Sequence, residues 1–284
     1  MRELAHLYDS DVRGLPEKLG RPFAWQEHLQ WLARQDQQVA REYWKNHLSE
    51  LTEPSRLQLS PPAVAQTGTG ALYFTFDQSL NDQFEQFARL HGLTQASVLM
   101  GLYALVLAKT SRLSDLVIGS VHNGRANSVN GIDQAIGLFI DTLPLHIALP
   151  AGQALVDWLA QQQTAQAEQD VHSHIGLAAI QTLAGFPGTS IFEALFVFEN
   201  FPTDASTIPV GELTVLESLG HDGTNYPLAL GAIPGKTLSL RLTFDQARID
   251  ASQAQQLMDR LCGLIRALPA IATTPLAAIS LVDA

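Results

Sequence analysis

A carboxylate and a hydroxyl interrupt one strongly apolar run near the middle of the chain. Asp141 and Thr142 lie inside the segment 136–145, and Arg125 follows a separate strand-like segment at 115–121. A buried carboxylate is costly unless a partner compensates it. Arg125 is an available cation, so one interpretation is a structural Arg125–Asp141 ion pair. The other is that these polar groups line a substrate channel, and the residues alone leave both open.

The histidines give a weaker signal. His172 and His174 are two residues apart, but no third ligand lies near them in the sequence, so we do not expect a metal site. The triplet 221–223, His-Asp-Gly, is flanked by glycine and by threonine and asparagine, which is typical of a polar turn between strands. Phosphate-binding glycine loops and the GxSxG nucleophile pattern are missing from the sequence.

Two further side chains each have a structural and a chemical interpretation. Tyr226 stands before Pro227 and either enters a strand or contacts a substrate. Cys262 lies in a helix-like segment, which favours a buried, inert thiol over a nucleophile. As the single cysteine of the chain, it also excludes an internal disulfide and a thiolate zinc site.

Hydrophobic periodicity shows which elements must position these residues. Helical and strand-like segments alternate first, and strands then cluster, which predicts an α/β sandwich with a mixed sheet. Pro144 suits an edge strand or a bulge. Helices are expected at 2–8, 23–51 (one helix or a pair), 79–91, 98–110 with Thr94 as N-cap, 154–170, 177–183 and 251–268. Strands are expected at 72–76, 115–121, 138–149, 192–198, 213–216, 228–233 and 238–244, the last two forming a hairpin.

Composition limits the class of protein. The chain has 284 residues, of which 46% are hydrophobic and 16% charged, as in a globular protein with a sizeable core. Its net charge of −11, without basic blocks, makes it a poor candidate for nucleic-acid binding. Neither a signal peptide nor an apolar run long enough for a membrane span is recognisable, so we expect a cytoplasmic protein.

The order of several short motifs resembles the condensation domain of nonribosomal peptide synthetases. Each motif is weak by itself, but together they cover nearly the whole chain in the family's order. Asn123 precedes Gly124-Arg125 where the family has Ser, and Asp141 stands where it often has Asn. The matching segments are Trp31 with Tyr43-Trp44 and Leu48, the strand and turn 119–125, the IGxFxNTxPLR-like run 136–145 followed by His146, the segment 174–181, the FxxLxxxENxP-like run 192–202, and Tyr226-Pro227-Leu228.

The family's catalytic motif, HHxxxDG, does not occur in this sequence. The resemblance places it just before the first helix, whereas residues 221–223 lie elsewhere and lack the paired histidine. The resemblance therefore implies a C-terminal lobe with the chloramphenicol-acetyltransferase-like fold, an α/β two-layer sandwich whose mixed sheet is flanked by helices. Residues 1–52 would be linking helices from a missing lobe, and residues 53–284 the C-terminal lobe.

The same resemblance implies a division of labour across a shared tunnel. The missing lobe supplies the catalytic histidine, so we assign no catalytic residue and no metal ligand to this chain. Asp141, Arg125, Asn123 and Tyr226 are expected to line the substrate channel. A segment between Phe192 and Tyr226 is expected to cross to the other lobe.

The implied partners are an N-terminal condensation lobe, peptidyl or aminoacyl carrier proteins, and an adjacent adenylation domain. Phosphopantetheine belongs to those carriers and is not bound directly. Because an inter-lobe face would be uncovered, a homodimer is the other expected assembly.

Two functions follow from the resemblance. The chain is either half of an amide-forming acyltransferase, inactive alone, or a non-catalytic lobe that docks carrier proteins or serves as a scaffold. An epimerisation-type relative would share the fold, but the motifs at 199–200 and 226–228 favour condensation. Whether the boundary at Met1 is natural is left open.

Overall fold

A computed structural model describes residues 2–16, 19–64, 66–125, 129–132, 135–199 and 224–281. The expected strand at 213–216 and the triplet 221–223 lie outside these residues. The helices are α1 (Arg2–Val12), α2 (Trp25–Arg34), α3 (Gln37–His47), α4 (Gln78–Leu90), α5 (Gln95–Ser111), α6 (Leu155–Val171), α7 (Leu177–Leu183), α8 (Ala251–Ile271) and the 3-10 helix η3 (Leu276–Ala278). The strands are β1 (Thr69–Thr75), β2 (Asp115–Asn123), β3 (Ile140–Ala148), β4 (Ala194–Phe198), β5 (Leu228–Ile233) and β6 (Ser239–Asp245).

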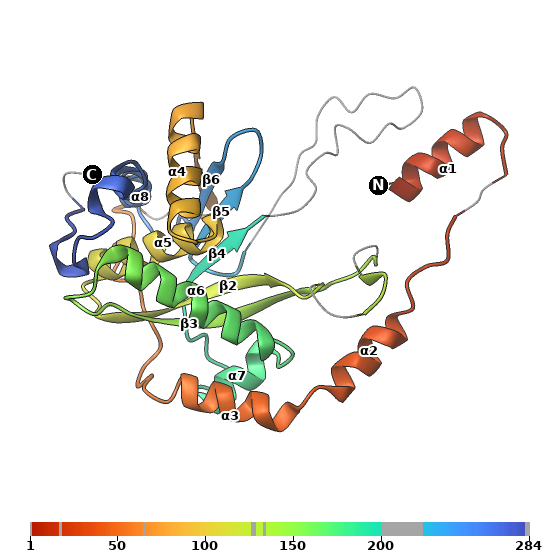
Figure 1. Cartoon of the computed structure of the whole chain (residues 1–284), viewed down its shortest axis with the longest axis horizontal. Helices are drawn as coiled ribbons and strands as arrows, with labels where there is room; N and C mark the ends of the chain where they lie inside the picture. Colours follow the sequence, from red (N-terminus) through yellow and green to blue (C-terminus); the bar gives the residue numbers. More distant parts are fainter. Residues whose placement is uncertain are drawn as a thin grey trace.

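The six strands form one mixed sheet in the order β1-β6-β5-β4-β2-β3 (Figure 1). β2, β4 and β5 run parallel, whereas β3, β6 and β1 each pair antiparallel with their neighbour. Because β4 and β5 are parallel to β2, the ends of these three strands lie at the same edge of the sheet. The expected α/β architecture with a mixed sheet flanked by helices is confirmed.

The main core lies on one face of the sheet, under α4, α5 and α8. α5 is buried around most of its circumference, which explains its nearly continuous apolar sequence. Its first turn begins at Thr94, whose side chain accepts a hydrogen bond from the backbone N–H of Ser97. Thr94 is therefore the N-cap that the sequence predicts.

A second core lies on the opposite face. Val117, Leu195 and Ala229 alternate along their strands with residues of the main core, so they point to the other side of the sheet. α3 and α7 cover them. Trp44 of α3 is fully buried there, and its indole N–H donates to the backbone carbonyl of His172 at 2.9 Å. This contact fixes α3 against the segment that follows α6.

Most predicted elements are present with bounds shifted by a few residues. The long segment 23–51 is a helix pair, α2 and α3, broken at Gln35-Asp36, where Asp36 caps α3 through its side chain. β3 is an edge strand that contains Pro144, as expected. β5 and β6 form the predicted hairpin.

The described helices contain no single segment that is both long and apolar enough to cross a membrane. Only α4 and α5 taken together reach that length and composition, and they are bent by 100° relative to each other.

Candidate functional site

Asp141 lies at the edge of the sheet where β2 ends and β3 begins. It stands directly opposite His122 in the antiparallel pairing, so the two side chains share one face. Asp141 is exposed, which corrects the expectation that it is a buried carboxylate. Partial loss of hydration raises its pKa, while the nearby imidazoles of His122 and His28 act in the opposite direction.

A second carboxylate orients His122. Its Nδ1 forms an ion pair with Asp170, at the end of α6. Its Nε2 is buried without a hydrogen-bond partner among the described residues. His28 of α2 is also buried, and within the described chain its Nδ1 has no partner either. Asp170 pairs with His122, and the imidazoles of His122 and His28 lie close enough to Asp141 to act on its carboxylate electrostatically, so the four side chains form one polar cluster.

These groups do not form a metal centre. Within the described ranges, no set of three or more His, Cys, Asp or Glu side chains is arranged to hold a metal ion. His172 instead stacks on Tyr43, with ring centroids 4.2 Å apart. Cys262 is buried, and burial raises its pKa to about 11, so its thiol stays protonated at neutral pH. The expected inert thiol is thereby supported.

Arg125 does not pair with Asp141, so of the two interpretations that the sequence leaves open, the structural ion pair is wrong. Its guanidinium donates to the backbone carbonyls of Ile132 at 2.9 Å and Ala135 at 2.6 Å. The same group lies 4.4 Å from the centroid of the Phe139 ring. A guanidinium can donate several bonds at once, and here it ties together the loop between β2 and β3. Arg125 therefore shapes the approach to Asp141 from within the loop.

Asn123 lies next to the same loop but faces the other way. It pairs with Ile140, one position from the His122–Asp141 pair, so its side chain points to the opposite face from Asp141. Its side-chain oxygen accepts a hydrogen bond from the backbone N–H of Arg125 at 3.2 Å. This hydrogen bond shapes the turn after β2.

Tyr226 lies at the other end of the sheet. It precedes β5, whose start pairs with the start of β4, whereas Asp141 lies beside the end of β2. Its ring stacks on Phe192, with centroids 4.9 Å apart, and partial burial raises its pKa. The backbone of Asp141, Arg125 and Asn123 thus lies in one region, where β2 ends and β3 begins, but their side chains do not contact one another. Tyr226 lies apart from them, in the strand-entry position.

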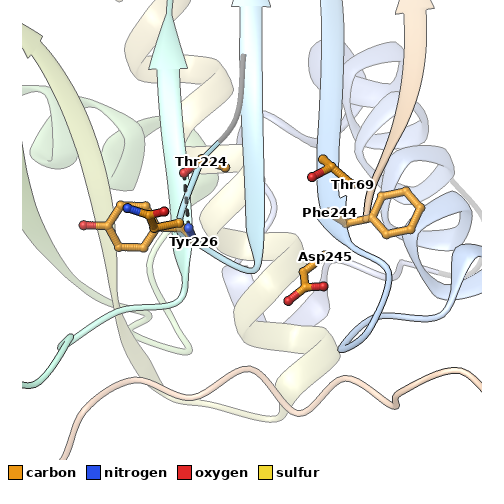
Figure 2. Close-up of a pocket in the computed structure, with 6 residues that line it drawn as sticks. Thr69, Thr224, Tyr226, Phe244 and Asp245 are labelled. Atoms are coloured by element: carbon orange, nitrogen blue, oxygen red, sulfur yellow. Dashed lines mark hydrogen bonds between the residues drawn. The ribbon is translucent and has the colours of Figure 1, made fainter. Parts of the chain in front are cut away.

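A small hollow lies beside Tyr226. Figure 2 shows Thr224 and Tyr226 on one side of it and Thr69, Phe244 and Asp245 on the other. Its volume is about 80 Å³, which is room for a few water molecules only. The hollow adds no catalytic group to the cluster around Asp141.

Trp25 fastens α2 to the loop that leads into Asp141. Its indole N–H donates to the carbonyl of Ile136 at 3.1 Å, and its ring stacks on Phe139 at 4.6 Å with an angle of 10°. A Cβ at Gly137 would overlap the Trp25 ring, so this close packing requires glycine. Trp25, His28, His122 and Asp170 are not among the site residues predicted from the sequence. No motif in the sequence marks these four residues, because strand register and helix packing bring them together.

Comparison with known proteins identifies a family that matches this chain. The description of the matching family is Condensation domain, and the match covers residues 1–284. The chain belongs to the condensation-domain family. Bacitracin synthase 1 of Bacillus licheniformis is 30% identical over 257 residues, which is 87% of this chain and 5% of that protein. Chondramide synthase cmdD of Chondromyces crocatus is 29% identical over 255 residues, which is 88% of this chain and 6% of that protein.

Solved structures show the same fold. The X-domain from teicoplanin biosynthesis superposes with a TM-score of 0.82 at 19% identity, over 98% of this chain and 67% of that one. The condensation domain from the Monacolin K polyketide synthase MokA gives 0.77 at 16% identity, over 97% and 68%. This condensation-family chain thus spans a small fraction of its curated relatives and about two thirds of these solved chains.

Proposed function

We propose that the chain supplies the C-terminal lobe of a nonribosomal peptide synthetase condensation domain. With an N-terminal lobe that carries HHxxxDG, it would join a carrier-tethered acyl donor to an aminoacyl acceptor. One observation carries the proposal: nearly the whole chain aligns with only about two thirds of a condensation domain, 97% against 68%. In keeping with this, HHxxxDG does not occur in the sequence. We keep residues 1–52 as the linking segment and 53–284 as the lobe proper.

The reaction would be acyl transfer from a thioester to an amine. The acceptor nitrogen attacks the thioester carbonyl, the C–N bond forms, and the C–S bond breaks. The nitrogen loses a proton, and the departing thiolate gains one. The other lobe would supply the catalytic histidine, and this chain the opposite wall of the channel near Asp141. Both substrates would be held on phosphopantetheine arms of carrier proteins, so Cys262 has no part in the transfer.

The proposed partners follow from this reaction. They are the N-terminal lobe, a donor and an acceptor carrier protein, and an adjacent adenylation domain. In support, the chain aligns at a TM-score of 0.76 with 23% of a four-domain nonribosomal peptide synthetase bound to AMP and glycine. A second copy of the chain is the other assembly we consider.

The test is reconstitution. The purified chain is mixed with an N-terminal condensation lobe, and peptide formation between two loaded carrier proteins is followed by mass spectrometry. We expect no product from either part alone and product from the mixture. Turnover by the isolated chain would overturn the requirement for a second lobe, and a mixture that binds without turnover would favour a docking role.

That docking role is the second candidate function. The specific observation in its favour is the likeness to the teicoplanin X-domain, which has also been solved in complex with the protein OxyB, at a TM-score of 0.78 over 98% of this chain. On this proposal the chain is a non-catalytic lobe that binds carrier proteins or other synthetase partners. The docking role would be supported if the chain and an N-terminal lobe together make no peptide, yet the chain binds carrier protein and the Asp141→Ala variant binds it equally well.

A further inference from the structure

His122 on β2 is held in place by a carboxylate from a different element. Its Nδ1 forms an ion pair with Asp170, at the end of α6, and its side chain is only 14% exposed. This contact requires a proton on Nδ1, so Nε2 carries the lone pair when the imidazole is neutral. Nε2 is buried, and among the described residues it has no hydrogen-bond partner. A buried polar atom without a partner costs free energy, which indicates a role beyond packing.

Asp141 is the carboxylate that strand register places beside this ring. His122 and Asp141 are directly opposite in the antiparallel pairing of β2 and β3, which puts their Cβ atoms about 4.5–5.5 Å apart on one face. Asp141 Oδ2 also lies 3.4 Å from the position that a Cβ at Gly124 would take, so the carboxylate rests against the turn after β2. The imidazoles of His122 and His28 attract this carboxylate electrostatically.

A second His–Asp pair on the same two strands does not face Asp141. His146 on β3 contacts Asp115 on β2, with Nε2 and Oδ2 3.3 Å apart, and its side chain is also 14% exposed. His146 lies opposite Val117, whose side chain belongs to the second core. Because successive residues of a strand alternate between faces, His146 and His122 lie on opposite faces of the sheet. The chain therefore contains a matched control for His122.

We propose that His122, held by Asp170, is a positioning residue that fixes the Asp141 carboxylate in the wall of the substrate channel. This inference rests on the proposed function, in which Asp141 lies in that wall. A fixed carboxylate can accept a hydrogen bond from the acceptor amine and hold the nitrogen in place for attack on the thioester. His122 would not touch the substrate and would act through Asp141, and Asp170 would act through His122.

Two substitutions separate the roles of the two ring nitrogens of His122. His122→Asn retains an amide N–H near the position of Nδ1, so the contact with Asp170 is kept and the group at Nε2 is lost. His122→Gln instead places its amide near the position of Nε2. His146→Asn is the matched control on the other face of the sheet. Thermal unfolding checks that each variant folds.

The first measurement is turnover by the chain reconstituted with an N-terminal condensation lobe. We expect His122→Asn to lower kcat by about tenfold, with KM for the loaded acceptor carrier protein within about twofold of the wild-type value. His122→Gln should recover at least about half of the wild-type kcat, and His146→Asn should leave kcat within about twofold. Because His122 acts through Asp141, adding His122→Asn to Asp141→Asn should cost less than about twofold more, whereas independent effects would multiply.

The second measurement needs no partner lobe. The pKa of Asp141 is followed in the purified chain by NMR of its carboxyl carbon. The imidazole of His122 lowers the pKa of Asp141, so His122→Asn should raise that pKa. His146→Asn should leave it unchanged, because His146 lies on the other face of the sheet.

The outcomes separate this inference from the proposed function. If the wild-type mixture makes product but His122→Asn leaves kcat unchanged, or its loss multiplies with that of Asp141→Asn, the inference is overturned and the proposed function stands. An Asp141 pKa that does not change in His122→Asn would also overturn the inference. If the wild-type mixture makes no product, the proposed function fails, and the catalytic role of His122 fails with it whatever the titration shows.

Discussion

The surroundings of His47 favour its neutral imidazole form. Its Nε2 accepts a hydrogen bond from the side-chain amide of Gln169 at 2.9 Å, and the same amide donates to the carbonyl of Pro144. The imidazole also stacks on Tyr43. Burial, with a smaller contribution from His146, lowers the pKa of His47 to about 4. A proton on Nε2 would face the donating amide, so the folded state needs neutral His47.

This arrangement predicts a loss of stability in mild acid. Between the usual pKa of 6.5 and about 4, the unfolded chain binds a proton at His47 that the folded chain does not. The free energy of unfolding should therefore fall as the pH falls through this window, by an amount on the order of 1–3 kcal/mol from this group. Urea titrations at pH 7 and pH 5 measure it. His47→Gln should flatten the dependence, whereas the control His6→Gln, at an exposed position, should leave it unchanged.

Asp141 leads to a different kind of prediction, because it is exposed and has no ion pair with Arg125. Asp141→Asn should leave the free energy of unfolding within about 0.5 kcal/mol of the wild-type value. In the reconstituted two-lobe enzyme it should lower turnover by about tenfold, corresponding to ~1.4 kcal/mol of transition-state stabilisation. Chemical denaturation and single-turnover kinetics make the comparison. Unchanged turnover would remove Asp141 from the channel wall.

At the scale of elements, the loop before β3 depends on a residue from a distant helix. Trp25→Ala should free the segment around Phe139, because it removes both the stacked ring and the hydrogen bond to Ile136. Chymotrypsin should then cut after Leu138 or Phe139 at least about tenfold faster, since local opening controls cleavage. Trp31→Ala on the same helix is the control, because the Trp31 ring stacks on His28 and not on Phe139. Equal cleavage in both variants would contradict the role of Trp25.

A second element depends on one buried carboxylate. Glu193, which immediately precedes β4, accepts hydrogen bonds from the backbone N–H of Leu57 and from Arg248 and Arg56. Burial alone would raise the pKa of Glu193, but these donors outweigh it and the pKa is lowered. Stability from this group is thus present above its usual pKa and lost as the pH falls below it. Glu193→Gln should lower the free energy of unfolding by about 1–3 kcal/mol at pH 7, measured by urea denaturation, because it weakens the hydrogen bonds that this buried side chain accepts.

The helices and strands could be predicted from the sequence, whereas the arrangement of the candidate site could not. Regular helices and strands were found because their periodicity and caps are local, as with Thr94 at the start of α5. An Arg125–Asp141 pair was one of two interpretations of the sequence. It is wrong because charge complementarity says nothing about loop geometry, and backbone carbonyls bind the guanidinium instead. The separation of Tyr226 from Asp141 depends on strand order and direction, which motifs do not encode.

At the scale of the whole molecule, the described sheet has a core on each face, while apolar side chains of the β2–β3 loop and of α1 remain exposed. Leu138 at the β2–β3 loop and Val12 on α1 are 83% and 64% exposed. Covering such groups contributes roughly 25 cal/mol per Å² of apolar area removed from water. The chain has the order of elements expected of a folded lobe, yet its free energy in solution depends on what covers these surfaces.

The isolated chain should therefore self-associate, and an N-terminal condensation lobe should suppress this by occupying the same surface. Sedimentation velocity over a concentration series measures both effects. We expect a rise in weight-average mass with concentration for the chain alone, and a single heterodimer boundary on adding the lobe. The variant Leu138→Glu should reduce self-association, whereas the control Leu90→Glu, at an exposed position on α4, should not. A chain that stays monomeric at all concentrations and is unchanged by the lobe would show that these apolar groups need no cover.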